Sequence, residues 1–247
     1  MKIFIDTANL QEIESALKRG FIRGITTNPS LLAKEPKTAF ETHIGKIVKL
    51  IKEYQPGISF SVEVFSRDPK EILEQALRFY DAFDYPDLAI KVQIGWDELE
   101  IINRLSREGV KVNCTACMSI KQAVMAAAAG ARFVSLFWAR IRDGGLDDEK
   151  NKAMRDGFLA RHPGALEQKD FDPNYVVSQT RCALDREYPN AEIIAGSMRT
   201  AADVKNAGLA GAHIITVPPK LFPAMAGHYK TDEVVNQFLT DFAGWMK

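Results

Sequence analysis

The stretch that decides the fold class is Leu88-Ala89-Ile90-Lys91-Val92-Gln93-Ile94, a nearly continuous apolar run with one lysine in its middle. A run of this length and composition is typical of a parallel strand covered on both faces. A segment of helical period follows it near 96–107, and another apolar run follows at 110–117. The repeating unit is therefore a strand, a helix and a second strand.

This unit repeats along the whole chain. The expected strands lie at 2–6, 24–28, 58–64, 88–94, 110–117, 132–138, 191–198 and 212–218. The expected helices lie near 9–19, 37–53, 68–83, 96–107, 119–129, 170–187, 200–207 and 231–245, with a short extra helix around 148–160 and a loop from there to about 170. Eight strands alternating with helices predict an α/β fold, a single (β/α)8 TIM barrel domain over 1–247 with a C-terminal helix at 231–245.

A doubly wound parallel sheet is the competing architecture. It would need a glycine-rich phosphate-binding turn after an early strand. The turn after the second run reads Thr26-Thr27-Asn28-Pro29-Ser30 and lacks that glycine pattern. The sequence therefore favours the closed barrel.

The amino-acid composition indicates which binding partners and which cellular compartment to expect. The chain carries 32 basic and 32 acidic side chains, with no basic arm, which gives no support to nucleic-acid binding. No apolar stretch approaches the roughly 20 residues of a membrane helix, and the first residues do not resemble a signal peptide, so we expect no membrane partner. An odd, low count of three cysteines fits a reducing, cytoplasmic location.

Two of the cysteines, Cys114 and Cys117, have the C-x-x-C spacing of some zinc and redox sites. A zinc site would need two further ligands, and only Cys182 and four scattered histidines remain. Small apolar residues in a packed strand are the simpler interpretation. We therefore expect no metal.

Polar residues gather near the carboxyl ends of seven of the eight runs, where a barrel has its active site. They are Asp6, Thr26, Thr27, Asn28, Glu63, Lys91, Asn113, Thr115, Ser135, Arg140, Ser197 and Arg199. The eighth run offers nothing comparable. Each residue also has an ordinary role, such as a helix cap for Asp6 and Asn28 or an edge-strand charge for Lys91. A barrel would not bury so many polar groups unless they paired with one another or with a ligand. A buried Lys91 amine could attack a carbonyl to form a Schiff base.

With these residues the chain resembles the short-chain branch of the transaldolase family, which also contains fructose-6-phosphate aldolases. The resemblance runs from residue 1 to about 245. It is carried by 4–9 (Phe-Ile-Asp-Thr-Ala-Asn), 24–32 (Gly-Ile-Thr-Thr-Asn-Pro-Ser-Leu-Leu), 62–64 (Val-Glu-Val), 90–92 (Ile-Lys-Val), 112–115 (Val-Asn-Cys-Thr), 134–137 (Val-Ser-Leu-Phe), 194–199 (Ile-Ala-Gly-Ser-Met-Arg) and 216–218 (Thr-Val-Pro).

The resemblance implies a lysine Schiff base with the ketone of a sugar phosphate, formed by Lys91. It implies that Asp6 handles the proton of the hydroxyl whose carbon–carbon bond breaks, and that Glu63 and Thr115 hold a water that shuttles protons. No metal or organic cofactor is required. The remaining candidates would bind substrate: Asn28, Asn113 and Ser135 at the dihydroxyacetone unit, Arg140, Ser197 and Arg199 at the phosphate, and Thr26 and Phe137 beside them.

Residues at two positions distinguish the transferase members of the branch from its aldolase members. Aldolase members of the branch tend to carry Gln at the position of Glu63 and Tyr at that of Phe137. We therefore expect transfer of a dihydroxyacetone unit from a ketose phosphate to an aldose phosphate. Cleavage of the fructose-6-phosphate aldolase type, an unusual anionic ketose as substrate, and a non-catalytic barrel are the alternatives.

The chain departs from the branch at three places: the segments 93–96 and 116–118, and a stretch at 157–170 that is longer than usual. Trp96 and Met118 are expected near the mouth of the pocket. The resemblance also implies a homo-oligomer, a pentamer or decamer. The apolar stripe of the last expected helix would then either close this barrel or dock on a neighbour; it comprises Val234, Val235, Phe238, Leu239, Phe242 and Trp245.

Overall fold

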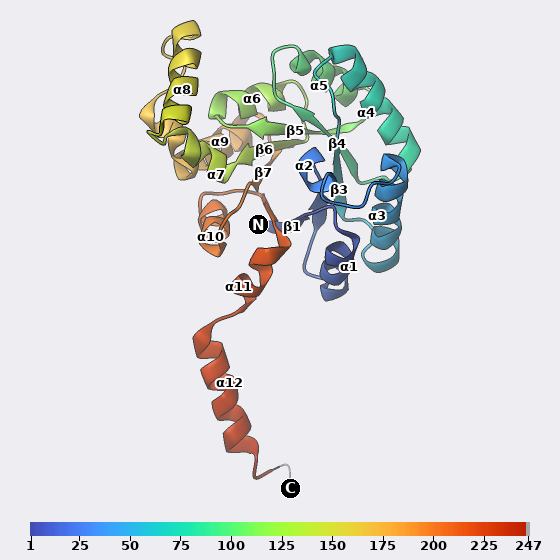
Figure 1. Ribbon diagram of the computed structural model, residues 1–247, viewed down its shortest axis with the longest axis vertical. Coiled ribbons are helices and arrows are strands. Elements are labelled where there is room, and N and C mark those ends of the chain that lie inside the picture. The colour runs from blue at the N-terminus through green and yellow to red at the C-terminus, as the bar shows by residue number, and fades with distance from the viewer. Residues whose placement is uncertain (246–247) are drawn as a thin grey trace.

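The computed structural model describes residues 1–245; Met246 and Lys247, the end of the expected 1–247 domain, lie outside the described residues. Eight parallel strands close into a barrel in chain order, with β8 paired to β1 (Figure 1). The strands are β1 Lys2–Asp6, β2 Gly24–Thr26, β3 Ser59–Glu63, β4 Leu88–Gln93, β5 Lys111–Cys117, β6 Phe133–Phe137, β7 Glu192–Gly196 and β8 Ile214–Val217. The (β/α)8 barrel expected from the strand–helix alternation is confirmed.

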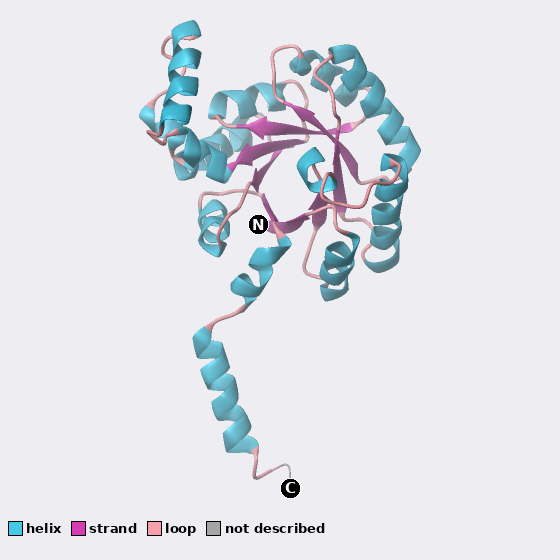
Figure 2. Cartoon of the chain, in the orientation of Figure 1, coloured by secondary structure: helices cyan, strands magenta, loops and turns pink. Residues whose placement is uncertain are grey.

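Helices surround the barrel and connect the strands (Figure 2). Those that alternate with the strands are α1 Leu10–Arg19, α3 Phe40–Tyr54, α4 Pro69–Phe83, α5 Glu98–Arg107, α6 Ile120–Ala128, α9 Pro173–Glu187 and α10 Ala201–Leu209. The further helices are α2 Pro29–Leu32, α7 Trp138–Gly144, α8 Glu149–Arg161, α11 Phe222–Ala226 and α12 Tyr229–Phe242, with 3-10 turns η1 Gln168–Phe171 and η2 Pro219–Leu221.

The helices begin where the sequence supplies caps. The Asn9 side chain accepts from the backbone N–H groups of the first turn of α1, and Ser119 does the same for α6. Gly20 ends α1 at a φ of 71°, in the left-handed region that suits glycine. The C-terminal helix starts two residues before the expected 231 and ends at Phe242, so Trp245 lies beyond its end.

Buried apolar side chains form two separate clusters. The larger lies between the barrel wall and the helices. The smaller, which we call the interior cluster, contains one residue from each of five strands: Phe4, Ala89, Phe133, Ile194 and Ile214. Gly24 makes room for it, because a Cβ at this position would come within 2.5 Å of the Phe4 ring. The interior cluster is the floor on which the site described below is built.

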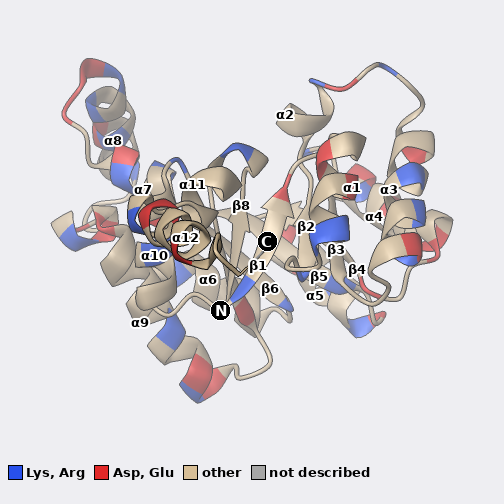
Figure 3. Cartoon of the chain, turned by 90° about the horizontal axis from the view of Figure 1, so that it is seen from below, with Lys and Arg blue, Asp and Glu red and all other residues tan. Residues whose placement is uncertain are grey.

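Two helical segments stand away from the barrel. α8 buries no residue, and α12 extends away from the rest of the chain with every residue exposed (Figure 1). Basic and acidic residues are interspersed along the outer helices (Figure 3). Within residues 1–245, no helix is both long and apolar enough to cross a bilayer.

Candidate active site

The polar residues of the barrel follow the interior cluster at a fixed spacing. Asp6 comes two residues after Phe4 in β1, and Lys91 comes two residues after Ala89 in β4. In β6, Ser135 follows Phe133 by the same step. Side chains alternate between the two faces of a strand, so each of these polar groups lies one layer above an interior apolar residue. The carboxyl ends of the strands therefore carry a polar layer inside the barrel.

Lys91 is buried in this layer, with 5% of the residue exposed. Its Nζ lies 2.7 Å from Glu63 Oε2 and donates a hydrogen bond of 2.8 Å to the carbonyl oxygen of Thr27. Glu63 and Lys91 are direct partners in the β3–β4 register, which explains why the two side chains meet. The amine is thus held by a carboxylate and a carbonyl oxygen, away from bulk solvent.

Asp6 lies at the end of β1, which is separated from β3 by β2 alone in the closed barrel. Its Oδ1 accepts a hydrogen bond of 2.7 Å from Thr26, whose hydroxyl lies 2.6 Å from that of Thr216. Burial raises the pKa of Asp6, although the positive charge of Lys91 opposes the shift. The ordinary role considered for Asp6, a helix cap, is not observed, because Asn9 caps α1.

Thr216 is a site residue that the sequence analysis missed. It lies in β8, two residues after Ile214, and it lines the same pocket as Asp6 and Lys91. Its single hydroxyl in an otherwise apolar run gives a weak signal. The spacing of two from an interior residue would have identified it.

A second hydrogen-bonded group links β3, β5 and β6. Ser135 donates to Asn113 Oδ1 at 2.7 Å, and Asn113 Nδ2 donates to Ser61 Oγ at 3.1 Å. Thr115 lies two residues after Asn113, and its buried hydroxyl has no hydrogen-bond partner within residues 1–245. This hydroxyl is therefore available to a substrate or a solvent molecule.

Loops complete the rim of the pocket. Asn28 caps the short helix α2 through its Oδ1, which accepts from Leu31 N–H at 3.0 Å, and it also lines the pocket. Two non-glycine residues at the rim, Ala116 and Ser197, have φ values of 60° and 61°. Such conformations are uncommon outside glycine and are found at functional sites. Ala116 sits in an irregularity of the β5–β6 pairing.

These groups surround a pocket of 420 Å³. Of the candidate residues named from the sequence, Thr27, Asn113 and Arg199 do not line it; those that do are Asp6, Thr26, Asn28, Glu63, Lys91, Thr115, Ser135, Phe137, Arg140 and Ser197. Asn113 lies directly behind Ser135 and orients it. An amine, two carboxylates and several hydroxyls thus face one space large enough for a sugar phosphate.

Arg199 does not face this pocket. Its guanidinium pairs with both carboxylate oxygens of Asp143, and its backbone N–H donates to Asp203 Oδ2 at 3.1 Å. The helix expected near 200–207 begins at Ala201 with Thr200 as its cap, so Arg199 lies outside its first turn. Arg140 and Ser197 are therefore the only members of the expected phosphate group among the residues lining the pocket.

Neither Trp96 nor Met118 lines the pocket, contrary to the expectation for its mouth. Trp96 is 82% exposed on the loop between β4 and α5. Met118 lines a neighbouring cavity beside α6 and α7. Lys220, the other amine near a strand end, is exposed on η2.

The two cysteines of the C-x-x-C spacing are buried in β5, with their sulfur atoms 3.8 Å apart. The neighbouring Cys117 and burial raise the pKa of the Cys114 thiol well above its ordinary value, which disfavours the thiolate that a metal requires. Within residues 1–245, no group of three or more His, Cys, Asp or Glu side chains is arranged to hold a metal ion.

Comparison with known proteins gives matches over nearly the whole chain. Residues 3–245 match the family model described as Transaldolase/Fructose-6-phosphate aldolase. A probable transaldolase of Dehalococcoides mccartyi is 35% identical over 248 residues and covers 100% of both chains. One of Parvibaculum lavamentivorans is 35% identical over 242 residues, covering 98% of this chain and 96% of its own.

Among solved structures, a mandelate oxidase in complex with 2-hydroxy-phenylacetamide superposes with a TM-score of 0.53 at 12% identity, covering 88% of this chain and 64% of that one. This likeness concerns the fold alone. The match over nearly the full length and the curated relatives show the family. The chain belongs to the transaldolase/fructose-6-phosphate aldolase family.

Proposed function

We propose that this protein is a transaldolase that transfers a dihydroxyacetone unit from a ketose phosphate to an aldose phosphate through a Schiff base on Lys91. The observation that carries the proposal is the buried Lys91 amine, held 2.7 Å from Glu63 and facing the same pocket as Asp6. A lysine amine that faces an enclosed pocket can condense with a substrate carbonyl, and a neighbouring carboxylate can accept the proton that the ammonium must lose first. Membership of the family indicates the class of reaction, and the residues that line the pocket include a suitable group for each step.

Formation of the Schiff base begins with loss of a proton from the Lys91 ammonium. Glu63 Oε2 is close enough to accept it. The amine then adds to the ketone carbon, and the former ketone oxygen leaves as water after protonation. The free hydroxyl of Thr115 would hold the water that carries these protons.

Cleavage needs a base at the substrate hydroxyl next to the bond that breaks. Asp6 would take this proton in its ionised form. The electron pair of the broken carbon–carbon bond then moves into the protonated imine and gives an enamine. An aldose phosphate departs, and a second aldose phosphate accepts the three-carbon unit by the reverse steps.

The polar rim would orient the substrate. Asn28 and Ser135, the latter oriented by Asn113, face the dihydroxyacetone unit in this proposal. Arg140 would bind the phosphate with Ser197, since a guanidinium suits bidentate phosphate binding. Arg199 would take part only after leaving Asp143.

Glu63 and Phe137 support transfer of the dihydroxyacetone unit rather than its release, because aldolase members of the branch tend to carry Gln and Tyr at these two positions. A phenol at the position of Phe137 could activate water near the enamine, and phenylalanine cannot. An assay with the donor ketose phosphate alone tests this point. Slow release of free dihydroxyacetone compared with transfer to an added aldose phosphate is expected; equal rates would assign the aldolase reaction instead.

The Schiff base itself is tested by Lys91→Arg, which keeps a positive charge but cannot form an imine. We expect a loss of transfer activity of at least about 10⁴-fold, because covalent catalysis is removed while binding remains. Lys220→Arg is the matched control, since Lys220 is exposed. Turnover of Lys91→Arg close to that of the control would exclude the mechanism.

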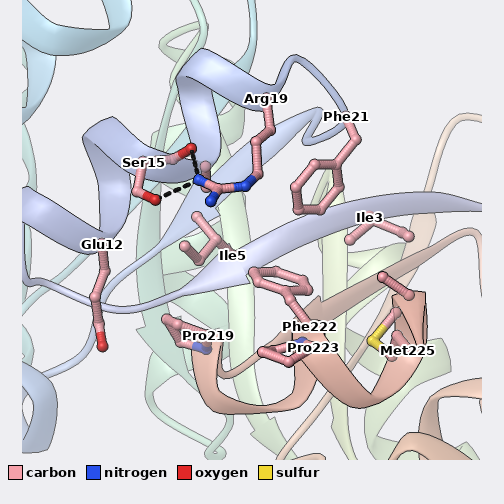
Figure 4. A pocket seen from close by; sticks show the side chains of 12 residues that line it. Ile3, Ile5, Glu12, Ser15, Arg19, Phe21, Pro219, Phe222, Pro223 and Met225 are labelled. Atoms are coloured by element: carbon pink, nitrogen blue, oxygen red, sulfur yellow. Dashed lines mark hydrogen bonds between the residues drawn. The ribbon is translucent and has the colours of Figure 1, made fainter. Parts of the chain in front are cut away.

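We also propose that the protein is a cytoplasmic homo-oligomer, a pentamer or decamer, in which α12 docks on a neighbouring subunit. The apolar residues of α12 have no cover from their own chain; Phe238 and Leu239, for example, are 65% and 66% exposed. Exposed apolar surface of this extent marks an interaction site. A groove of 620 Å³ beside α1 and α11, lined by Ile3, Phe21, Phe222 and Met225 among others, offers a matching surface (Figure 4).

Light scattering tests this assembly. A chain carrying both Phe238→Glu and Leu239→Glu is expected to dissociate, because two buried charges would oppose docking. Asn236→Glu and Thr240→Glu on the same helix form the control pair. An unchanged assembly size in the Phe238/Leu239 variant would contradict docking.

A further inference from the structure

A second cavity lies beside the catalytic pocket and belongs to no step proposed above. Its volume is 420 Å³. The lining is mostly apolar and comes from three places in the chain: Met118 before α6, Ile141 in α7, and Phe158, Leu166 and Phe171 in the segment from α8 to η1. This last segment includes the stretch at 157–170 that is longer than expected for the branch. Figure 1 shows α8 standing out from the barrel beside α7.

Charged groups hold the outer wall of this cavity in place. Lys121 Nζ, on α6, donates to the carbonyl oxygen of Ala165 at 2.7 Å and lies 3.4 Å from Asp170 Oδ2. On the other side, Arg155 of α8 donates to the carbonyl oxygen of Gly144 at 3.0 Å. The wall is therefore tied to both α6 and α7. Lys121 and Asp170 form an ion pair with each other.

Arg140 is the residue that joins the two cavities, because it lines both. Its neighbours along α7 are already paired: Arg142 with Asp203 at 2.9 Å, and Asp143 with Arg199. Within residues 1–245, no ion pair involves Arg140. Arg140 is thus an exposed residue without an ion pair among the described residues, and it lines both the mostly apolar cavity and the catalytic pocket.

We propose that this second cavity binds the apolar body of an organic anion whose anionic group pairs with Arg140. Apolar side chains favour an apolar body, and a guanidinium favours a carboxylate, sulfonate or phosphate. The volume lies within the range of small-molecule sites.

This inference rests on the proposed function in one respect, since Arg140 is also the proposed phosphate ligand. The anion can be part of a substrate that spans both cavities, or a separate ligand that competes with the substrate phosphate for Arg140. Both sources share the same chemistry, an anionic group attached to an apolar body. They differ in their effect on turnover.

Fluorescence titration of the full-length protein with 1-anilinonaphthalene-8-sulfonate, an aromatic sulfonate, tests the cavity. Ala165→Trp fills the cavity, and Phe158→Glu adds a negative charge to its wall at a residue that is 37% exposed. Ala160→Trp is the matched control, because Ala160 is exposed on the same segment and does not line the cavity. The control retains every other apolar site, so the difference between variants isolates this one.

We expect Ala165→Trp and Phe158→Glu each to weaken a binding component by about tenfold or more, while Ala160→Trp binds like the unmodified protein. Inorganic phosphate should compete for the same component. Unchanged binding in both cavity variants, or no effect of phosphate, would overturn the inference. The titration needs no turnover, so a failure of the Schiff-base chemistry would appear separately, in the Lys91→Arg assay.

Steady-state kinetics of Ala165→Trp with fructose 6-phosphate then identifies the source. A raised KM with an unchanged kcat would mean that the cavity takes part of the substrate. An unchanged KM together with loss of dye binding would mean a separate ligand. Either result supports the cavity as a binding site.

Discussion

Two layers of side chains inside the barrel differ sharply although they are only two residues apart along each strand. The interior cluster is apolar and fully packed, with Phe4, Ala89 and Phe133 among its members. The layer above it is polar and open to a pocket, with Asp6, Lys91 and Ser135 at the corresponding positions. We propose that the apolar layer stabilises the barrel and that the polar layer above it carries out the chemistry.

The first way to test this division is to neutralise a carboxylate of the upper layer. Asp6→Asn keeps the size of the side chain and an acceptor for the Thr26 hydroxyl, but it cannot act as a base. We expect transfer activity to fall by about 10²- to 10⁴-fold, the usual contribution of a general base. Asp81→Asn, at an exposed position of α4, should have no effect in the same assay.

The lower layer should respond in the opposite way. Phe4→Ala removes a fully buried ring and should lower the free energy of unfolding by about 3–5 kcal/mol. Leu209→Ala, at a residue that is 79% exposed, should change it by less than about 0.5 kcal/mol. Urea denaturation of both variants measures the difference. A loss for Phe4→Ala as small as that of the control would mean that the interior cluster does not support the barrel.

The raised pKa of Asp6 predicts a pH dependence of stability. Burial raises this pKa in the folded state above its unfolded value, so the folded protein holds the proton more tightly. Ionisation of Asp6 therefore costs stability as the pH rises from the unfolded pKa through the folded pKa. Asp6→Asn removes this cost.

Melting temperatures of Asp6→Asn and the unmodified protein should accordingly converge toward pH 4 and separate toward pH 7, with the variant more stable at pH 7. In kinetics, the activity of the unmodified protein should fall on the acid side through a pKa above the ordinary value of about 4 for Asp. A variant that is less stable than the unmodified protein at pH 7 would show that ionised Asp6 is well solvated or paired.

The smallest expected effect concerns Phe137, at the rim of the pocket. Phe137→Tyr adds a hydroxyl that could orient water toward the enamine. We expect release of free dihydroxyacetone to rise by a few-fold, with the transfer rate nearly unchanged, because only one weak general acid or base is added. A fall in both rates would mean that the ring packs against the substrate and does not control water.

The barrel was predictable because its signals are local. Apolar runs of strand length, capped helices and regular alternation all point to the same fold, and the structure confirms all eight strands within a few residues. The helices α2, α7 and α11 were missed, since each spans seven residues or fewer and has no clear period. Their existence depends on tertiary contacts that a pattern along the chain does not record.

The same limit applies to the pocket. The strand-borne residues Asp6, Glu63 and Lys91 could be placed together, because register in a parallel barrel follows from the strands. Arg199 follows the end of its strand, and its pairing with Asp143 depends on how the loop after β7 packs against α7. Thr216 was overlooked because one hydroxyl in an apolar run is a weak signal without its neighbours across the barrel.

The central claim is that the buried amine of Lys91 condenses with a ketose phosphate. Incubation with fructose 6-phosphate and borohydride, followed by peptide mass spectrometry, tests it most directly, because reduction makes the imine permanent. We expect the added mass of the reduced ketose phosphate on Lys91, and none on the exposed Lys220. Binding of the ketose phosphate with an unmodified Lys91 would contradict the account.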